Sequence, residues 1–131
     1  MKAAFTRVAQ RSLAAADAVL AQAIQEKAGF LAYHAFESIG GAYCTARGVP
    51  YHPASHPRKL ALFVQTAQQE RFARVTARLA IEVTALRNLL LYPRRCSDGS
   101  VARPETVVTA AQARRLVGRV NSLVKQVERV L

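Results

Sequence analysis

The sequence predicts an all-α protein, a single up-and-down antiparallel bundle of about five helices that spans residues 1–131. The composition is 51% apolar but only 7% aromatic, and a mixture rich in Ala, Leu and Val favours helices. Apolar residues recur at steps of three and four along most of the chain, which is the spacing of an amphipathic helix. The length suits one domain with one core, and most connections between the predicted helices are short.

The first two helices are predicted over residues 3–27 and 30–47, with Gly29 as the break between them. Gly40-Gly41 falls inside the second helix. A glycine there costs about 1 kcal/mol relative to alanine. We therefore expect another element to approach the backbone closely at this point.

The segment 48–54 begins with a glycine suited to ending a helix and contains two prolines, which exclude regular helix. Ser55 or His56 is expected to begin the third helix, with Pro57 in its first turn. The fourth helix, from Phe72 to Pro93, has the clearest pattern. Its apolar residues form one narrow stripe: Phe72, Val75, Leu79, Val83, Leu86 and Leu90.

A connection of 16 residues, 93–108, follows the fourth helix. A connection this long in a small helical domain is unusual and is often functional. Asp98-Gly99 predicts a turn within it. The last helix is expected to begin at Thr109, where Gln112 completes a capping box.

The net charge is +11, from 19 basic and 8 acidic residues, and 15 of the basic residues are arginines. Such a balance favours a polyanionic partner, and a guanidinium suits phosphate better than an ammonium does. A coding bias that replaces lysine with arginine and leaves ordinary solvated faces would give the same composition. Charge alone does not decide between the two interpretations.

Cys44 and Cys96 lack the paired spacing of a zinc or redox site, so we interpret both as reduced thiols in a cytoplasmic protein. No His-Glu-x-x-His motif occurs, and the three histidines lie in dissimilar contexts. We therefore expect no metal and no cofactor. No apolar run approaches the roughly 18 residues of a membrane span, so no membrane partner is expected.

Arg87 lies at the border of the apolar stripe of the fourth helix, with Asn88 next to it and Tyr92 one turn later. The arginine could bind a phosphate bidentately while the amide and the phenol donate hydrogen bonds to it. Alternatively, the arginine packs its stem on the core and forms a local salt bridge. The connection that follows adds three candidate nucleic-acid-binding residues: Arg94, Arg95 and Arg103.

Three segments in this order resemble the HEPN domain (higher eukaryote and prokaryote nucleotide-binding). AYHAFES at 32–38, followed by RGVPY at 47–51, is similar to the second helix of the family and its glycine turn. SHPRKL at 55–60 resembles the His-x-x-x-Leu start of its third helix. LRNLLLYP at 86–93, with its loop and terminal helix, resembles the Arg-Asn motif, so the resemblance covers residues 5–131.

The resemblance implies a metal-independent ribonuclease in active members, with an Arg, a polar residue and a His a few residues later. It also implies a homodimer in which two such motifs line one cleft. In this chain Arg87 and Asn88 match the first two positions, and Tyr92 stands in that of the histidine. No histidine follows His56, and Gly41 stands where many members carry lysine.

The tyrosine changes the expected chemistry. Cleavage through the 2′-hydroxyl needs a proton acceptor near neutral pH, which an imidazole with a pKa near ~6.5 provides and a phenol with a pKa near ~10 does not. Tyr92 could still donate a hydrogen bond to a phosphate or stack on a base. These residue types favour binding without cleavage.

Three functions follow from these patterns. The favoured one is a HEPN-like module that binds a nucleotide, an RNA or a minimal nucleotidyltransferase, as in toxin–antitoxin pairs of the family. The second is a metal-independent ribonuclease with an atypical Arg-Asn-x-x-x-Tyr site, in which Tyr92 or His34 takes part. The third is a purely structural oligomerisation domain whose arginine content is incidental.

Overall fold

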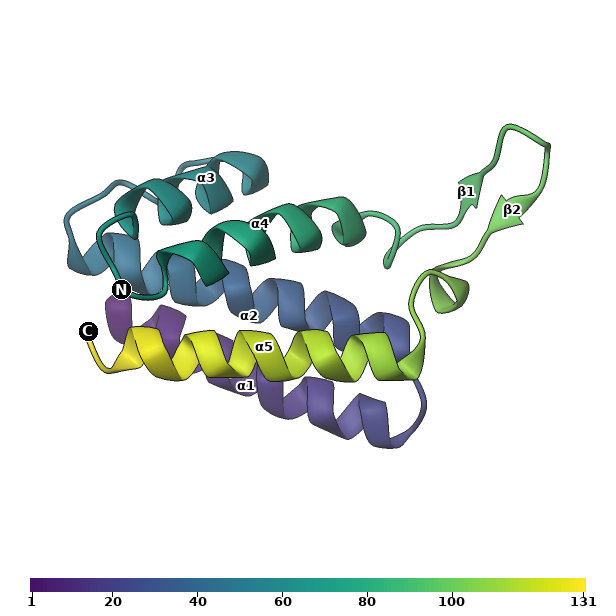
Figure 1. Ribbon diagram of the computed structural model, residues 1–131, viewed down its shortest axis with the longest axis horizontal. Coiled ribbons are helices and arrows are strands. Elements are labelled where there is room, and N and C mark those ends of the chain that lie inside the picture. Colours follow the sequence, from purple (N-terminus) through teal and green to yellow (C-terminus); the bar gives the residue numbers. More distant parts are fainter.

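The computed structural model describes residues 1–131 and contains five α-helices, a short β-hairpin and one 3-10 turn (Figure 1). The helices are α1 (Lys2–Ala21), α2 (Gln25–Ala46), α3 (His56–Thr66), α4 (Ala73–Arg87) and α5 (Ala110–Glu128). The hairpin pairs β1 (Arg94–Arg95) with β2 (Val101–Ala102), and η1 (Pro104–Thr106) leads into α5. The predicted all-α bundle of five helices is confirmed.

The predicted boundary between the first two helices is wrong. Residues 22–24 separate α1 from α2, and Gly29 lies inside α2. Ala23 makes the reversal with a φ of +57°, a conformation that residues with a Cβ adopt rarely. Gly29 packs against Leu90, because a Cβ on it would lie 2.9 Å from Leu90 Cδ1. This glycine therefore permits close packing and does not form a turn.

The predicted up-and-down antiparallel order does not hold between α2 and α3. The third helix runs in the same direction as the second, because residues 47–55 pass back along α2 before α3 begins (Figure 1). The contacts between α2 and α3 show the parallel arrangement, because residue numbers increase along both helices from one contact to the next: Tyr33 with His56, Gly40 with Phe63, and Cys44 with Thr66. Helix α4 then runs antiparallel to both. The start of α3 and the end of α4 thus meet beside the first half of α2.

The fourth helix is shorter than predicted, and a different face of it is buried. It ends at Arg87 instead of reaching Pro93, and residues 88–92 continue as turns. Val75, predicted in the apolar stripe, is 38% exposed, while Thr76 is fully buried. The reason is that α4 packs closely on α2 and α3 but leaves a groove toward α5, where Val75 lies.

The fifth helix closes the bundle against α1 and α2. The predicted capping box is confirmed: the Gln112 N–H donates to Thr109 Oγ1 at 3.1 Å, and the Thr109 N–H donates to Gln112 Oε1 at 2.8 Å. The apolar stripe of α5 is buried: Ala113, Leu116, Val117, Val120, Leu123, Val124 and Val127. Val130, at the end of the same pattern, is 41% exposed.

The long connection after α4 forms a hairpin that extends away from the bundle (Figure 1). The predicted turn is confirmed, since Gly99 has a φ of +85° and Asp98 Oδ1 accepts from the Ser100 N–H at 2.9 Å. Gln25 Nε2 donates to the Glu105 carbonyl at 3.0 Å, which ties the foot of the hairpin to α2.

Cys44 is buried beside Thr66, Cys96 is partly buried in the hairpin, and both are free thiols. No group of three or more His, Cys, Asp or Glu side chains gathers as metal ligands would. No helix combines the length and the hydropathy that crossing a bilayer requires.

Other side chains approach the backbone closely at Gly40 and Gly41, as the sequence predicts. A Cβ on Gly40 would lie 2.8 Å from Phe63 Cδ1, and one on Gly41 would lie 2.9 Å from Phe5 Cδ1. Phe63 is fully buried and packs between the rings of Phe36 and Tyr43. Its ring therefore has little room to move aside.

We expect Gly40→Ala to lower the free energy of unfolding by about 1 kcal/mol, because overpacking of ~1–3 kcal/mol outweighs a helix-propensity gain of ~1 kcal/mol. Gly118→Ala is the matched control, since no atom lies within 4 Å of its added Cβ. That variant should gain about 1 kcal/mol. Urea unfolding measures both, and equal stabilisation of the two variants would contradict the packing at Gly40.

Candidate functional site

A pocket of about 170 Å³ lies where α2, α3 and α4 meet. Its lining comes from all three helices or the turn after α4: Tyr33, His56, Pro57, Leu60, Thr84, Arg87 and Asn88. The parallel course of α2 and α3 creates it, because the first turn of α3 thereby faces the last turn of α4. The predicted Arg-Asn pair thus lines a pocket together with a histidine from a different helix.

Arg87 is partly buried at the edge of the core, as its position in the helix predicts. Its Nη1 donates to Asn88 Oδ1 at 2.8 Å, and its guanidinium carbon lies 5.5 Å from the centre of the Tyr33 ring. No carboxylate forms a salt bridge with it. Its Nε is buried and has no hydrogen-bond partner. An unsatisfied buried donor costs about 1–3 kcal/mol.

His56 and Glu37 form a hydrogen-bonded pair beside the arginine. His56 Nδ1 lies 2.6 Å from Glu37 Oε2 and 3.2 Å from the Tyr33 hydroxyl, which itself donates to the same carboxylate oxygen. Because a carboxylate only accepts, Nδ1 carries the proton and Nε2 is left as the free edge of the ring. The His56 side chain is 51% exposed, so a ligand can reach it.

The environment of Glu37 keeps it ionised. Burial alone would raise its pKa, but the hydrogen bonds with Tyr33 and His56, together with the charge of Lys59, hold the pKa below the usual 4.5. Lys59 Nζ lies 3.6 Å from Oε1. The Tyr51 hydroxyl donates to the Glu37 carbonyl at 2.6 Å and fixes the backbone here. Glu37 therefore orients the imidazole as a fixed anion.

Tyr33 stays a neutral donor in this cluster. Its burial and its hydrogen bond to Glu37 raise the pKa of the phenol well above the usual 10. Its ring also forms one wall of the pocket, beneath the guanidinium of Arg87.

Sequence reasoning missed His56 and Glu37 as site residues. Both lie in segments that carry the family resemblance, His56 before Pro57 and Glu37 at the end of the AYHAF run. Nothing in the sequence shows that α3 runs parallel to α2, and only that arrangement brings the pair to Arg87.

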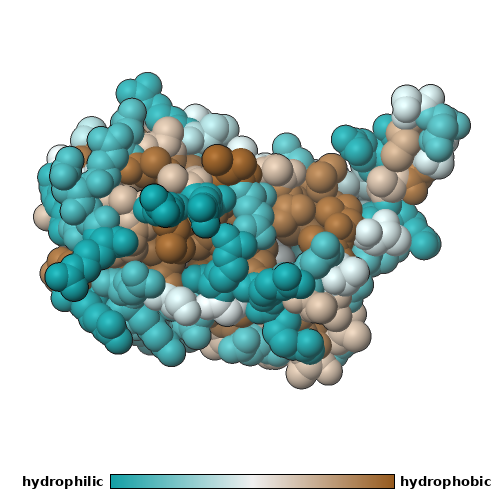
Figure 2. Space-filling view, in the orientation of Figure 1, coloured by the Kyte–Doolittle hydropathy of each residue, from teal (hydrophilic) through white to brown (hydrophobic).

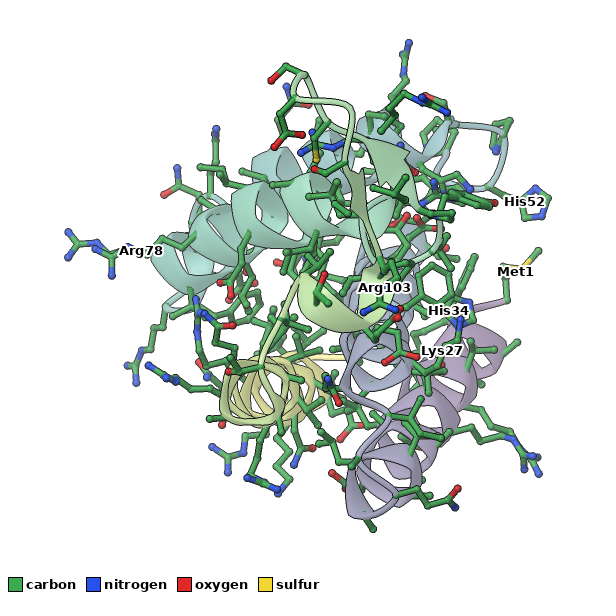
Figure 3. The ribbon with its side chains drawn as sticks, turned by 90° about the vertical axis from the view of Figure 1, so that its right-hand side faces the viewer. Met1, Lys27, His34, His52, Arg78 and Arg103 are labelled. Carbon is green, nitrogen blue, oxygen red and sulfur yellow. The ribbon has the colours of Figure 1, made fainter.

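Tyr92 and the three arginines of the hairpin region lie outside the pocket. The Tyr92 side chain is 64% exposed and does not line it. Arg94 and Arg95 are exposed on β1, which extends from the bundle. Arg103 lies at the foot of the hairpin, with its Nε 3.3 Å from Glu105 Oε1 (Figure 3). The predicted gathering of all six residues is therefore limited to Arg87 and Asn88.

His34 also lies away from this site. Its Nδ1 is 3.1 Å from the Ser12 hydroxyl on α1, and its side chain does not line the pocket. His34 is exposed, and this hydrogen bond links α1 to α2 at the surface. His52 projects from the segment between α2 and α3 into solvent (Figure 3).

The site thus combines a guanidinium, an amide and an imidazole oriented by a carboxylate, around an open pocket. Such donors suit an anionic oxygen ligand. No family model matches the sequence, and searches of curated proteins and of solved structures return no match either.

Proposed function

We propose that the chain is a HEPN-like module that binds a phosphate group of a nucleotide or an RNA in the pocket at the end of α4, without cleaving it. The observation that carries this proposal is Arg87, which lines the pocket, is partly buried and forms no salt bridge with any carboxylate. Asn88 accepts from Nη1, and the guanidinium lines the pocket, so it can bind a ligand there.

The size of the pocket favours recognition of phosphate over recognition of a base. Its volume of about 170 Å³ is below the roughly 300–1,000 Å³ of pockets that enclose a whole small molecule. A phosphoryl group fits, while a ribose and base would extend over the open side. The ligand class is therefore a phosphate ester whose base identity matters little.

The outer face of α4 supports the homodimer implied by the family resemblance. Ile81 on this face is 75% exposed, and Ala77 and Ala85 lie on the same side of the helix at steps of four. Two copies joined along this face would bury Ile81 between them. A minimal nucleotidyltransferase, the other partner that the resemblance implies, would cover the same face.

We expect Arg87→Ala to weaken binding of a nucleotide and of a short RNA about 10- to 100-fold, because hydrogen bonds to a charged group contribute ~1.5–3 kcal/mol. Arg87→Lys should lose most of this affinity, since an ammonium lacks the planar fork. Fluorescence anisotropy at fixed salt measures both.

The control is Arg7→Ala, which removes an exposed arginine of α1 that forms no salt bridge. If Arg87→Ala and Arg7→Ala weaken binding equally, net charge alone explains the affinity. Unchanged binding in both variants would favour a purely structural oligomerisation domain.

One observation favours metal-independent RNA cleavage as a second candidate function. The imidazole that the segment after Arg87 lacks is supplied by α3, since His56 lines the same pocket as Arg87 and Asn88. The carboxylate of Glu37 orients it, as a third group orients the base in many hydrolytic sites. A cleavage assay with His56 variants, described in the Discussion, tests this candidate.

A further inference from the structure

A second basic surface lies in the groove between α4 and α5, on the side of α4 away from the pocket. Its lining contains one hydrophobic side chain, three arginines, two other polar residues and a glycine: Val75, Arg78, Arg115, Gly118, Arg119, Ser122 and Gln126. The groove has a volume of about 490 Å³. Figure 2 shows hydrophilic groups over the left and central part of this face and a large hydrophobic patch to the right of centre, and Arg78 extends into solvent in Figure 3.

The charges in this groove are poorly compensated. Glu82 pairs with Arg119, at 2.5 Å between Oε2 and Nη1, while Arg78 and Arg115 form no salt bridge. Arg115 and Arg119 are four residues apart on α5, and such like-charged pairs destabilise a helix by a few tenths of a kcal/mol, roughly. Glu82 offsets the charge of Arg119, so Arg78 and Arg115 are the two charges that a bound polyanion would neutralise.

Gly118 lies on the same face of α5 with no packing role. Glycine inside a helix costs about 1 kcal/mol relative to alanine, and Gly40 and Gly41 owe their place to close neighbours. A Cβ on Gly118 would meet no atom within 4 Å. Its effect is to leave bare backbone between two arginines, where a ligand can approach closely.

We propose that this groove binds the phosphodiester backbone of an RNA strand, independently of base sequence. Arg78 and Arg115 would contact successive phosphates from opposite sides, and Ser122 and Gln126 would donate hydrogen bonds. An acidic protein fits less well at this part of the seam, because a protein interface needs an apolar or aromatic centre and Val75 is the one hydrophobic residue of the groove. The apolar part of the seam lies farther along it, at Leu86, Val108 and Leu116.

The test compares two double variants that remove the same charge. Arg78→Gln with Arg115→Gln alters the groove, and Arg7→Gln with Arg11→Gln alters exposed arginines of α1 that form no salt bridge. The probe is a labelled single-stranded RNA of mixed sequence. Its dissociation constant is measured over a series of salt concentrations.

The groove variant should bind roughly tenfold more weakly near physiological salt, with a salt slope about 1.4 smaller, because each lost phosphate contact in a single strand contributes ~0.7. The α1 variant should change far less. Equal losses in both variants, or no RNA binding by the wild-type protein, would overturn the proposal. So would tighter binding of a polyglutamate peptide than of the RNA.

Two further measurements separate this proposal from the others. The groove variant should keep its affinity for a mononucleotide, which depends on Arg87, so the pocket and the groove can fail independently. Its thermal unfolding at low salt should show no loss of stability, because neither substituted arginine forms a salt bridge. A lower unfolding temperature together with weaker mononucleotide binding would overturn the assignment of the RNA effect to the groove.

Discussion

A Glu37→Leu variant is expected to unfold with a free energy about 3 kcal/mol lower than that of the wild-type protein, since removing one partner of a buried charged network leaves the others unpaired. Glu37 is 9% exposed and accepts hydrogen bonds from Tyr33 and His56, with Lys59 close by. His56 is half exposed, so the loss falls mainly on the buried Tyr33 hydroxyl and on Lys59.

The Glu37 carboxylate also makes the free energy of unfolding decrease at acid pH. Because its folded pKa lies below the usual 4.5, its contribution is fully present above about pH 5 and is lost as the pH falls through the folded value. Urea unfolding at neutral pH and at about pH 3.5 should therefore show a smaller acid loss in Glu37→Leu than in the wild-type protein.

Asp17→Asn is the control, because Asp17 is an exposed carboxyl of α1 without a salt bridge. That variant should match the wild-type protein at neutral pH. If Glu37→Leu were as stable as Asp17→Asn, the network around Glu37 would not hold α2 and α3 together as the structure indicates.

Under the second candidate function, His56→Ala is expected to lower the rate of RNA cleavage by a factor of about 10²–10⁴, which is the usual contribution of a positioned general base. His56 Nε2 would take the proton of a 2′-hydroxyl while that oxygen attacks the phosphorus. The P–O5′ bond then breaks, leaving a 2′,3′-cyclic phosphate and a 5′ oxygen that takes a proton from water. Arg87 would neutralise the charge that builds on the phosphate oxygens.

Cleavage is measured on single-stranded and structured RNA with a chelator present. Added imidazole should restore part of the rate to His56→Ala and none to Arg87→Ala, because only the first lacks a proton acceptor. Tyr92→Phe and His34→Ala should keep the wild-type rate, since neither side chain lines the pocket. No cleavage by the wild-type protein at micromolar concentration would end this candidate and leave phosphate binding intact.

The five helices and several of their ends follow from local patterns, although α4 ends at Arg87, before the predicted Pro93. The capping box at Thr109, the glycine that follows α2 and the start of α3 at His56 are all found where local rules put them. The break near residue 23 was missed, because Ala23 takes a left-handed conformation that normally signals glycine. Gly29 was wrongly predicted to break the helix. A glycine stands there because the Leu90 side chain packs against its backbone.

By itself, the sequence determined the helical class, the basic surface and the place of Arg87 and Asn88 at the edge of a core. Helical periodicity and charge depend on residues close together in the chain, so both can be read without the fold. Only the tertiary structure decided that His56 and Glu37 join them, that Tyr92 and the hairpin arginines do not, and that α4 and α5 leave a groove. The reason is physical. The direction of α3 relative to α2 depends on how whole helices pack, and no local sequence pattern encodes it.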